Sequence, residues 1–190
     1  MKSLMKLGVG GALLALAGMS NAALLDGKTL NDLYFSGPDK NTPVETYFNG
    51  NFVVGPGFEL LPDLSIGADA ALDVSDTQIT LVFAASFAGG GSVGVFDRIS
   101  DVFGQVRPFT SFTVNPSTTV VGFDQSRLSF DENNLFIDYT GLSYTTGQKL
   151  VFDITAAPVP EPETYALMLA GLAAVGAVAR RGKSENTTLR

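Results

Sequence analysis

The central part of the chain breaks into short apolar runs separated by turn-forming residues. β-Branched and aromatic residues are concentrated in these runs, which is typical of strands. The pattern predicts strands at 44–48, 51–54, 78–83, 111–114, 118–123, 127–130, 135–139 and 149–155. Apolar residues with a 3.6-residue period do not extend beyond about three turns, so a long helix is not expected in this part. Short helical turns are compatible with 66–72 and 97–103.

Turn residues indicate how these strands connect. Asn49-Gly50 predicts a hairpin within 44–54, because both residues tolerate a positive φ. A polar run of Asp, Glu and Asn predicts a second hairpin within 127–139. In 149–155 apolar residues recur at every second position, so one face of that strand is apolar.

These elements together predict the fold class. About eight to ten short antiparallel strands joined by Gly, Pro and Asn turns favour an all-β domain, an antiparallel β-sandwich of the jelly-roll type. An enclosed barrel is the alternative. The 14 phenylalanines supply the volume of the core, since each can bury up to about 200 Å². We expect this domain to occupy residues 23–157.

The first 22 residues have the composition of a secretory signal peptide. Lys2 and Lys6 precede the 11-residue apolar stretch 7–17, and small residues follow. The pattern predicts cleavage after Ala22 by signal peptidase, following engagement of the secretion machinery. The apolar stretch is too short to serve comfortably as a membrane anchor.

The C-terminal residues predict a membrane anchor. Residues 158–163 are rich in proline and are expected to form an extended linker, because proline cannot continue a strand ladder or a helix. Residues 164–179 carry no charge and would reach about 24 Å as a helix, a short transmembrane span. Arg180 and Arg181 then mark a basic cytoplasmic tail, residues 180–190, and act as a membrane stop.

A Pro-Glu-Pro segment, a short Ala/Gly/Leu-rich helix and an Arg-Arg cluster occur here in that order. This arrangement resembles the PEP-CTERM sorting signal of Gram-negative bacteria, with Pro160, Glu161 and Pro162 as the sorting residues. The resemblance implies an exosortase-type transpeptidase as partner, in cells that make exopolysaccharide. A tail-anchored protein with a proline-rich stalk is the alternative and has the same topology. In either case the protein is exported across the inner membrane. If the segment is a sorting signal, the anchor is only transient, and the protein then reaches the surface or extracellular matrix.

Composition excludes several functional classes. The chain contains no histidine or cysteine, which removes Ser-His-Asp triads, thiol nucleophiles, disulfides and the usual zinc ligands. Residues 23–157 contain sixteen acidic and six basic residues, a net charge of −10. Such a charge repels nucleic acid, which is therefore not an expected partner.

Two acidic groups are candidate calcium sites. They are Asp69, Asp73 and Asp76 in one loop region, and Asp131, Glu132, Asn133 and Asn134 in another. Neither has the EF-hand spacing, and capping of turns by these side chains is the favoured interpretation, so no cofactor is expected. Tyr139 and Tyr144 could stack on sugars, although aromatic residues in strands more often belong to the core.

The leading hypothesis is an exported, exosortase-processed surface or matrix protein associated with exopolysaccharide or biofilm and without catalytic activity. The first alternative is an extracellular carbohydrate- or calcium-binding module. The second is a carboxylate-based hydrolase, which would require a pair of carboxylates in an aromatic-lined cleft.

Overall fold

The computed structural model describes residues 24–65, 69–89, 93–157, 168–173 and 175–176. Residues Ala22–Val159 form one compact unit. Its strands are β1 (Thr29–Gly37), β2 (Glu45–Val53), β3 (Ala70–Val74), β4 (Gln78–Phe83), β5 (Gly94–Ser100), β6 (Phe109–Val114), β7 (Leu128–Phe130), β8 (Asn134–Asp138) and β9 (Lys149–Ala156). A single turn of 3₁₀ helix, Gln125–Arg127, precedes β7.

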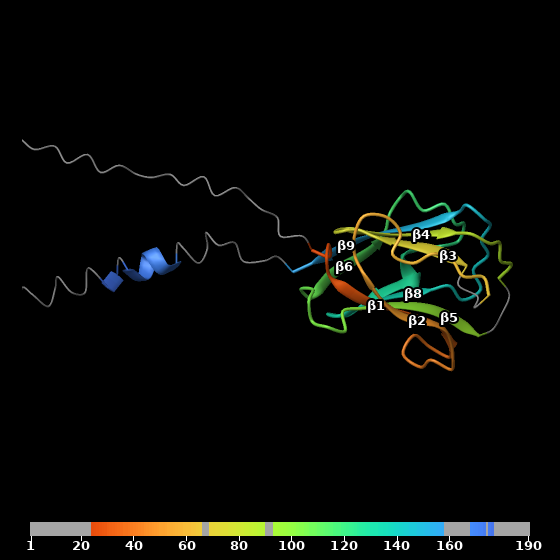
Figure 1. The fold of residues 1–190 in the computed structure, drawn as a ribbon, viewed down its shortest axis with the longest axis horizontal. Coiled ribbons are helices and arrows are strands. Elements are labelled where there is room, and N and C mark those ends of the chain that lie inside the picture. The colour runs from red at the N-terminus through yellow and green to blue at the C-terminus, as the bar shows by residue number, and fades with distance from the viewer. Residues whose placement is uncertain (1–23, 66–68, 90–92, 158–167, 174, 177–190) are drawn as a thin grey trace, which may run out of the picture. The chain divides into compact units, whose positions relative to one another are not determined.

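The strands form two antiparallel sheets (Figure 1). The five-stranded sheet has the order β2-β1-β5-β8-β7, and the four-stranded sheet has the order β3-β4-β9-β6. Hairpins join β1 to β2, β3 to β4 and β7 to β8, whereas the other connections pass from one sheet to the other. The predicted all-β, antiparallel class is confirmed.

One apolar core joins the facing sides of the two sheets. Leu30, Ile99 and Leu135 from the five-stranded sheet and Ile79 and Phe152 from the four-stranded sheet belong to the same buried cluster. The alternating pattern of 149–155 explains its part in this core. Leu150, Phe152 and Ile154 are all buried and lie on one face of β9, because alternate side chains of a strand point to the same side.

Several predicted strands are confirmed with small changes of boundary. The segment 78–83 is β4, 111–114 lies within β6, and 149–155 lies within β9. The hairpin predicted within 127–139 is formed by β7 and β8, where Leu128 is opposite Ile137. Asp131 closes its loop by accepting hydrogen bonds from the backbone N–H groups of Asn133 and Asn134, at 2.9 and 2.8 Å.

The hairpin predicted at Asn49-Gly50 is wrong. Both residues lie inside the continuous strand β2, where they are opposite Leu33 and Asp32 of β1. Gly50 is not among the glycines with a positive φ, so it does not use the freedom on which the prediction rested. The segments on either side of Asn49 pair with β1 instead of with each other.

The strand β1 was not predicted, and its environment explains why. Leu33 and Phe35 face away from the shared core and form a second buried cluster with Phe96. The connection from β1 to β2 carries Lys40, whose Nζ lies 4.6 Å from the ring centroid of Phe136 on β8. With both faces of β1 partly covered, the strand lacks the apolar–polar alternation that marks a half-exposed strand.

The strand predicted at 118–123 is also wrong, because this segment does not join either sheet as a strand. The Thr118 hydroxyl donates to the Val151 carbonyl at 3.0 Å and so keeps the segment beside β9. Gly122 has a φ of 82°, a left-handed conformation that turns the chain and ends its extended course. The β-branched residues here therefore cover the edge of the core without extending a sheet.

The two short helical turns considered from the sequence are corrected as well. Residues 97–100 belong to β5, so the turn considered for 97–103 is wrong over its first part. Residues 70–72 belong to β3, so the turn considered for 66–72 is wrong over its last part, while 66–68 lie outside the described residues. In both places pairing with a neighbouring strand outweighed local preference.

The C-terminal part is described only at residues 168–173 and 175–176, which are helical. Within the described residues, no helix has the length and apolar character needed to cross a membrane. The predicted signal peptide 1–22, the linker 158–163, the tail 180–190 and part of the predicted span 164–179 lie outside the described residues.

Candidate functional site

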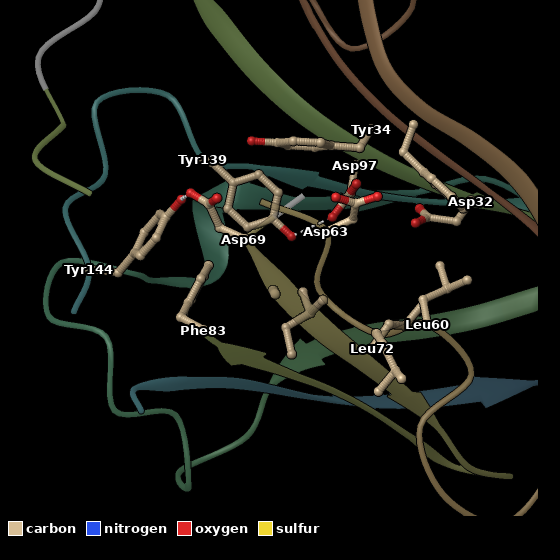
Figure 2. Close-up of a pocket in the computed structure, with 14 residues that line it drawn as sticks. Asp32, Tyr34, Leu60, Asp63, Asp69, Leu72, Phe83, Asp97, Tyr139 and Tyr144 are labelled. Atoms are coloured by element: carbon tan, nitrogen blue, oxygen red, sulfur yellow. Dashed lines mark hydrogen bonds between the residues drawn. The ribbon is translucent and has the colours of Figure 1, made fainter. Parts of the chain in front are cut away.

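A cavity of about 260 Å³ lies between the two sheets (Figure 2). Strand β1 contributes an acidic and an aromatic side chain, β5 contributes an acidic one, and β3 and β4 contribute only apolar ones. The residues that line it are Asp32, Tyr34, Phe48, Leu60, Leu61, Asp63, Asp69, Ala70, Leu72, Leu81, Phe83, Asp97, Tyr139 and Tyr144. Its volume is enough for a small molecule of about ten non-hydrogen atoms, scaling from the roughly 150 Å³ cavity that holds benzene.

Strand register brings Asp32 and Asp97 to the same face. Tyr34 is opposite Asp97, and Asp32 is opposite Ile99, in the antiparallel pair β1–β5. Because side chains alternate along a strand, Asp32 and Tyr34 both point inward, and Asp97 is the diagonal neighbour of Asp32. Figure 2 shows the two carboxyl groups turned toward each other over the apolar side chains of Leu60 and Leu72.

Each of these carboxyl groups has a buried oxygen without a partner. Asp32 is 7% exposed and Asp97 is 8% exposed. The Tyr139 hydroxyl donates to Asp97 Oδ2 at 2.7 Å, but Asp97 Oδ1 and Asp32 Oδ1 have no hydrogen-bond partner within the described structure. Buried polar atoms are nearly always paired, so two unpaired oxygens on residues that line one cavity make this cavity the candidate site.

Burial also changes how these groups titrate. It raises the pKa of Asp97 to about 7, an effect that the Tyr139 hydrogen bond opposes. The pKa of Asp32 is raised well above its usual value, first by burial and then by the charge of Asp97. The pair therefore retains a proton at neutral pH, since two adjacent carboxylates cannot readily both ionise in a site with little water.

Aromatic rings form one wall of the cavity. Tyr144 stacks on Phe83 with centroids 3.8 Å apart, and its hydroxyl donates to Asp69 Oδ2 at 3.0 Å. Tyr34 meets Tyr139 edge to face at 6.2 Å. Burial, followed by the charges of nearby aspartates, raises the pKa values of these three tyrosines, which therefore stay neutral.

A second cavity of about 250 Å³ lies beyond this wall. It shares Tyr34, Asp69, Tyr139 and Tyr144 with the first, and adds apolar residues such as Phe87. The three tyrosines thus lie between the two cavities. Asp69, which accepts the hydrogen bond from the Tyr144 hydroxyl, lines both cavities.

The first cavity opens to solvent beside the segment that precedes β3. Leu61 is 74% exposed and Asp63 is also at the surface, yet both line the cavity. The Ser65 hydroxyl and backbone N–H bind Asp63 Oδ1 at 2.6 and 3.0 Å and lower the pKa of that carboxyl. Four aspartates and no lysine or arginine occur among the described lining residues, so the entrance and the interior both favour cations.

The first of the two candidate calcium groups, Asp69, Asp73 and Asp76, is not brought together. Asp69 lines the cavities, whereas Asp73 is paired opposite Thr80, and Asp76 Oδ1 accepts the backbone N–H groups of Leu25 and Asp26. No group of three acidic residues that could hold a metal ion is found within the described ranges. In the second group, Asp131, Glu132 and Asn133 form the β7–β8 loop and Asn134 begins β8; hydrogen bonds to Asp131 close this loop.

Sequence reasoning identified Tyr139 and Tyr144 but missed Asp32 and Asp97. Both tyrosines are buried and line the cavity, so they are core residues that also face the site. The missed signal is an aspartate at an inward position of a strand. Asp32 lies two residues after the buried Leu30, and Asp97 lies two residues before the buried Ile99. This signal has meaning only once β1 and β5 are recognised as strands.

The predicted cleavage and sorting residues lie outside the described residues. They are Ala22, Pro160, Glu161, Pro162, Arg180 and Arg181. The structure adds no geometry for them.

A Pro-Glu-Pro segment followed by an apolar stretch and a basic end is the arrangement of a C-terminal protein-sorting signal. Residues 158–183 match the family model of the PEP-CTERM protein-sorting motif. The chain therefore carries this motif, as the resemblance predicted. The motif implies export, recognition by exosortase and anchoring at the membrane before processing. No curated protein and no solved structure gives a significant match to the chain.

Proposed function

We propose that this chain is a surface or extracellular-matrix protein without catalytic activity, processed by an exosortase and associated with exopolysaccharide. The match of residues 158–183 to the PEP-CTERM motif carries the proposal. The net charge of −10 on residues 23–157 is compatible with a soluble role outside the cell. In this proposal residues 1–22 are removed after Ala22, and the two sheets form a sandwich of the jelly-roll type.

The sorting step follows from the chemistry of the motif. Pro160 and Pro162 prevent helix propagation upstream of the apolar segment 164–179, so the peptide around Glu161 stays extended. An extended peptide offers unpaired backbone groups to an enzyme, whereas those of a helix are already bonded to one another. Arg180 and Arg181 set the depth of the membrane segment and thereby the height of the Pro-Glu-Pro segment above the bilayer.

The mass of the mature protein in cells with and without an exosortase tests this proposal. The wild-type chain should lose its C-terminal residues only when the exosortase is present. Glu161→Ala should leave export intact while full-length precursor accumulates in the membrane. Glu132→Ala, an exposed glutamate in the β7–β8 loop, is the matched control and should be processed normally. A C-terminus that persists in both strains would reduce the motif to a plain membrane anchor.

The absence of catalysis is part of the proposal and has its own test. Asp32 and Asp97 are the carboxyl pair that acid–base chemistry would use, because both line the cavity and the pKa of Asp97 is raised to about 7. We expect the purified chain to hydrolyse no exopolysaccharide. Release of reducing sugar that disappears in Asp97→Asn would overturn this part and favour the hydrolase alternative.

A ligand-binding module is the second candidate. The two buried oxygens without partners and the three tyrosines that line the cavity favour a bound molecule. The calcium form of this alternative has less support, since no three of the described acidic residues lie close enough together to hold a metal ion. A rise in melting temperature on adding calcium would restore it.

A further inference from the structure

We propose that the cavity between the sheets binds a small organic amine, in its ammonium form, with a compact apolar body. This inference rests on the ligand-binding candidate given above and names the chemical class of its ligand. Three observations support it. Asp32 and Asp97 each have a buried oxygen without a partner in the described structure, four aspartates in all line the cavity, and leucine side chains line another part of it.

Hydrogen-bond capacity selects a donor. Asp32 Oδ1 and Asp97 Oδ1 are both buried and have no partner among the described residues, and Asp97 Oδ2 already accepts a hydrogen bond from the Tyr139 hydroxyl. An ammonium group presents three N–H donors and no acceptor, so two of its donors can serve the two unpaired oxygens, and it brings no acceptor that would itself need a partner. A ligand carboxylate or phosphate would add a negative charge to an acidic cavity and is excluded by repulsion.

The other residues that line the cavity favour an apolar group on the amine. Figure 2 shows Leu60 and Leu72 on the side of the cavity opposite the two carboxyl groups, and Leu81, which also lines the cavity, is the partner of Leu72 in the β3–β4 pair. The faces of Tyr34 and Tyr139 can add cation–π attraction to a desolvated ammonium group. A sugar ring that fills the cavity would place some of its hydroxyl groups against the leucine side chains, where they find no partner, so an apolar body fits that side better.

The proposal predicts that binding of the amine releases a proton, which can be measured. An ammonium ion favours the ionised form of the pair, so the proton that Asp32 and Asp97 retain is released to solvent on binding. The other titratable groups that face the pair are Tyr34 from β1, Asp63 and Asp69 from the segment before β3, and Tyr139 and Tyr144 from the segment after β8. Affinity should therefore rise between pH 5 and 8, a range in which an aliphatic amine with a reference pKa of about 10 stays charged.

Calorimetric titration of the purified full chain tests the inference. Cyclohexylmethylamine is the probe, cyclohexylmethanol is its uncharged counterpart, and glucose represents the carbohydrate alternative. We expect the amine to bind at least tenfold more tightly than the alcohol. Titrations in buffers of different ionisation enthalpy should show proton release.

Two variants locate the binding, and one serves as control. Asp97→Asn and Asp32→Asn each keep the shape of the side chain and should each weaken amine binding at least tenfold while reducing proton release. Asp73→Asn is the matched control, because Asp73 is adjacent in sequence to Leu72 and therefore points to the other side of β3. It should bind the amine as the wild-type chain does. Melting curves of all three verify that they are folded.

The outcomes distinguish a failure of the amine proposal from a failure of the ligand-binding module on which it rests. Equal binding of the amine and the alcohol, or binding of glucose alone, would overturn the amine class while leaving a ligand-binding module. Amine binding that survives both Asp32→Asn and Asp97→Asn would place the ligand elsewhere and overturn the site. Failure of all three probes to bind would overturn both.

Discussion

The two sheets share one core, but their facing sides have different chemistry. The four-stranded sheet contributes apolar side chains, namely Leu72, Val74, Ile79, Leu81, Phe83, Phe112, Leu150, Phe152 and Ile154. The five-stranded sheet places Asp32, Tyr34 and Asp97 between its leucines and isoleucines. The buried polar residues Asp32, Ser36, Asp97, Ser100 and Asp101 all lie on that sheet or directly after β5. One side of the core only packs, whereas the other also presents polar groups to a cavity.

Asp97 and Asp101, two buried aspartates of the five-stranded sheet and the segment after it, show how a carboxyl group that faces the cavity differs from one that stabilises a loop. Asp101 Oδ1 accepts the backbone N–H of Gln105 at 3.0 Å, and its Oδ2 accepts that of Val106 at 2.7 Å. Both oxygens of Asp101 are thus used to close a loop. Asp97 is equally buried but keeps Oδ1 open. Burial of a carboxyl group alone therefore does not mark a candidate ligand site; what distinguishes Asp97 from Asp101 is an oxygen without a partner in the described structure.

The largest change in the free energy of unfolding should come from a substitution in the apolar face of the four-stranded sheet. Phe152 is fully buried between Phe112 and Phe123, with centroid separations of 5.3 and 5.5 Å. Phe152→Ala leaves a void in a close-packed region and should lower the free energy of unfolding by about 3–5 kcal/mol. Denaturant titration of the full chain measures this. Phe103→Ala, at a residue 54% exposed, is the control and should change it by less than about 0.5 kcal/mol.

A somewhat smaller change in the free energy of unfolding should come from the buried aspartates of the five-stranded sheet, and this change depends on pH. Asp97 has a pKa raised by burial to about 7, against 3.8 for the exposed group. The folded chain therefore holds this proton more tightly than the unfolded chain. Its stabilising contribution is complete below about pH 4 and is lost as the pH rises through about 7. Between pH 5 and 8 the free energy of unfolding should fall by about 3 kcal/mol, at 1.36 kcal/mol for each pH unit below 7.

The variant Asp97→Asn sharpens this test. It cannot ionise, so the decline in stability between pH 5 and 8 should become much shallower, and at pH 8 the variant should be more stable than the wild-type chain. The remaining slope reports Asp32, whose raised pKa acts in the same direction. Asp73→Asn should retain the wild-type slope. A wild-type chain whose stability is constant over this range would contradict the account of the buried pair.

Strands were predicted best where a single face is buried. Segment 78–83 coincides with β4, whose side chains are alternately buried and half-exposed. In β9, Leu150, Phe152 and Ile154 are buried on one face, and the sequence alternates there even though Val151 on the other face is also buried. β1 and β5 have buried residues on both faces, so their periodicity is lost, and neither was predicted.

The site could not be predicted for the same reason. Asp32 and Asp97 are 65 positions apart in the sequence and meet only through the antiparallel register of β1 and β5. The Asn49-Gly50 error had the same origin, because a local turn preference was outweighed by pairing of β2 with β1. The sorting motif, in contrast, is read from residues that are adjacent in the chain. Local patterns therefore predicted the targeting of the protein, and the cavity required the long-range pairing of strands.

The smallest effect concerns carboxylates that close their own loops, in contrast to those that face the cavity. Asp131 Oδ1 accepts the backbone N–H groups of Asn133 and Asn134 in hydrogen bonds that are exposed at the surface. Asp131→Ala removes these acceptors and should lower the free energy of unfolding by about 1 kcal/mol, a typical value for the loss of a capping side chain. Glu132→Ala in the same loop should have no measurable effect. Because the loop lies apart from the cavity lining, amine binding by Asp131→Ala should equal that of the wild-type chain. Calcium should leave the melting temperature of both chains unchanged. A calcium-induced rise in the wild-type chain that disappears in Asp131→Ala would show that this loop is a metal site and that its carboxylate does more than close a turn.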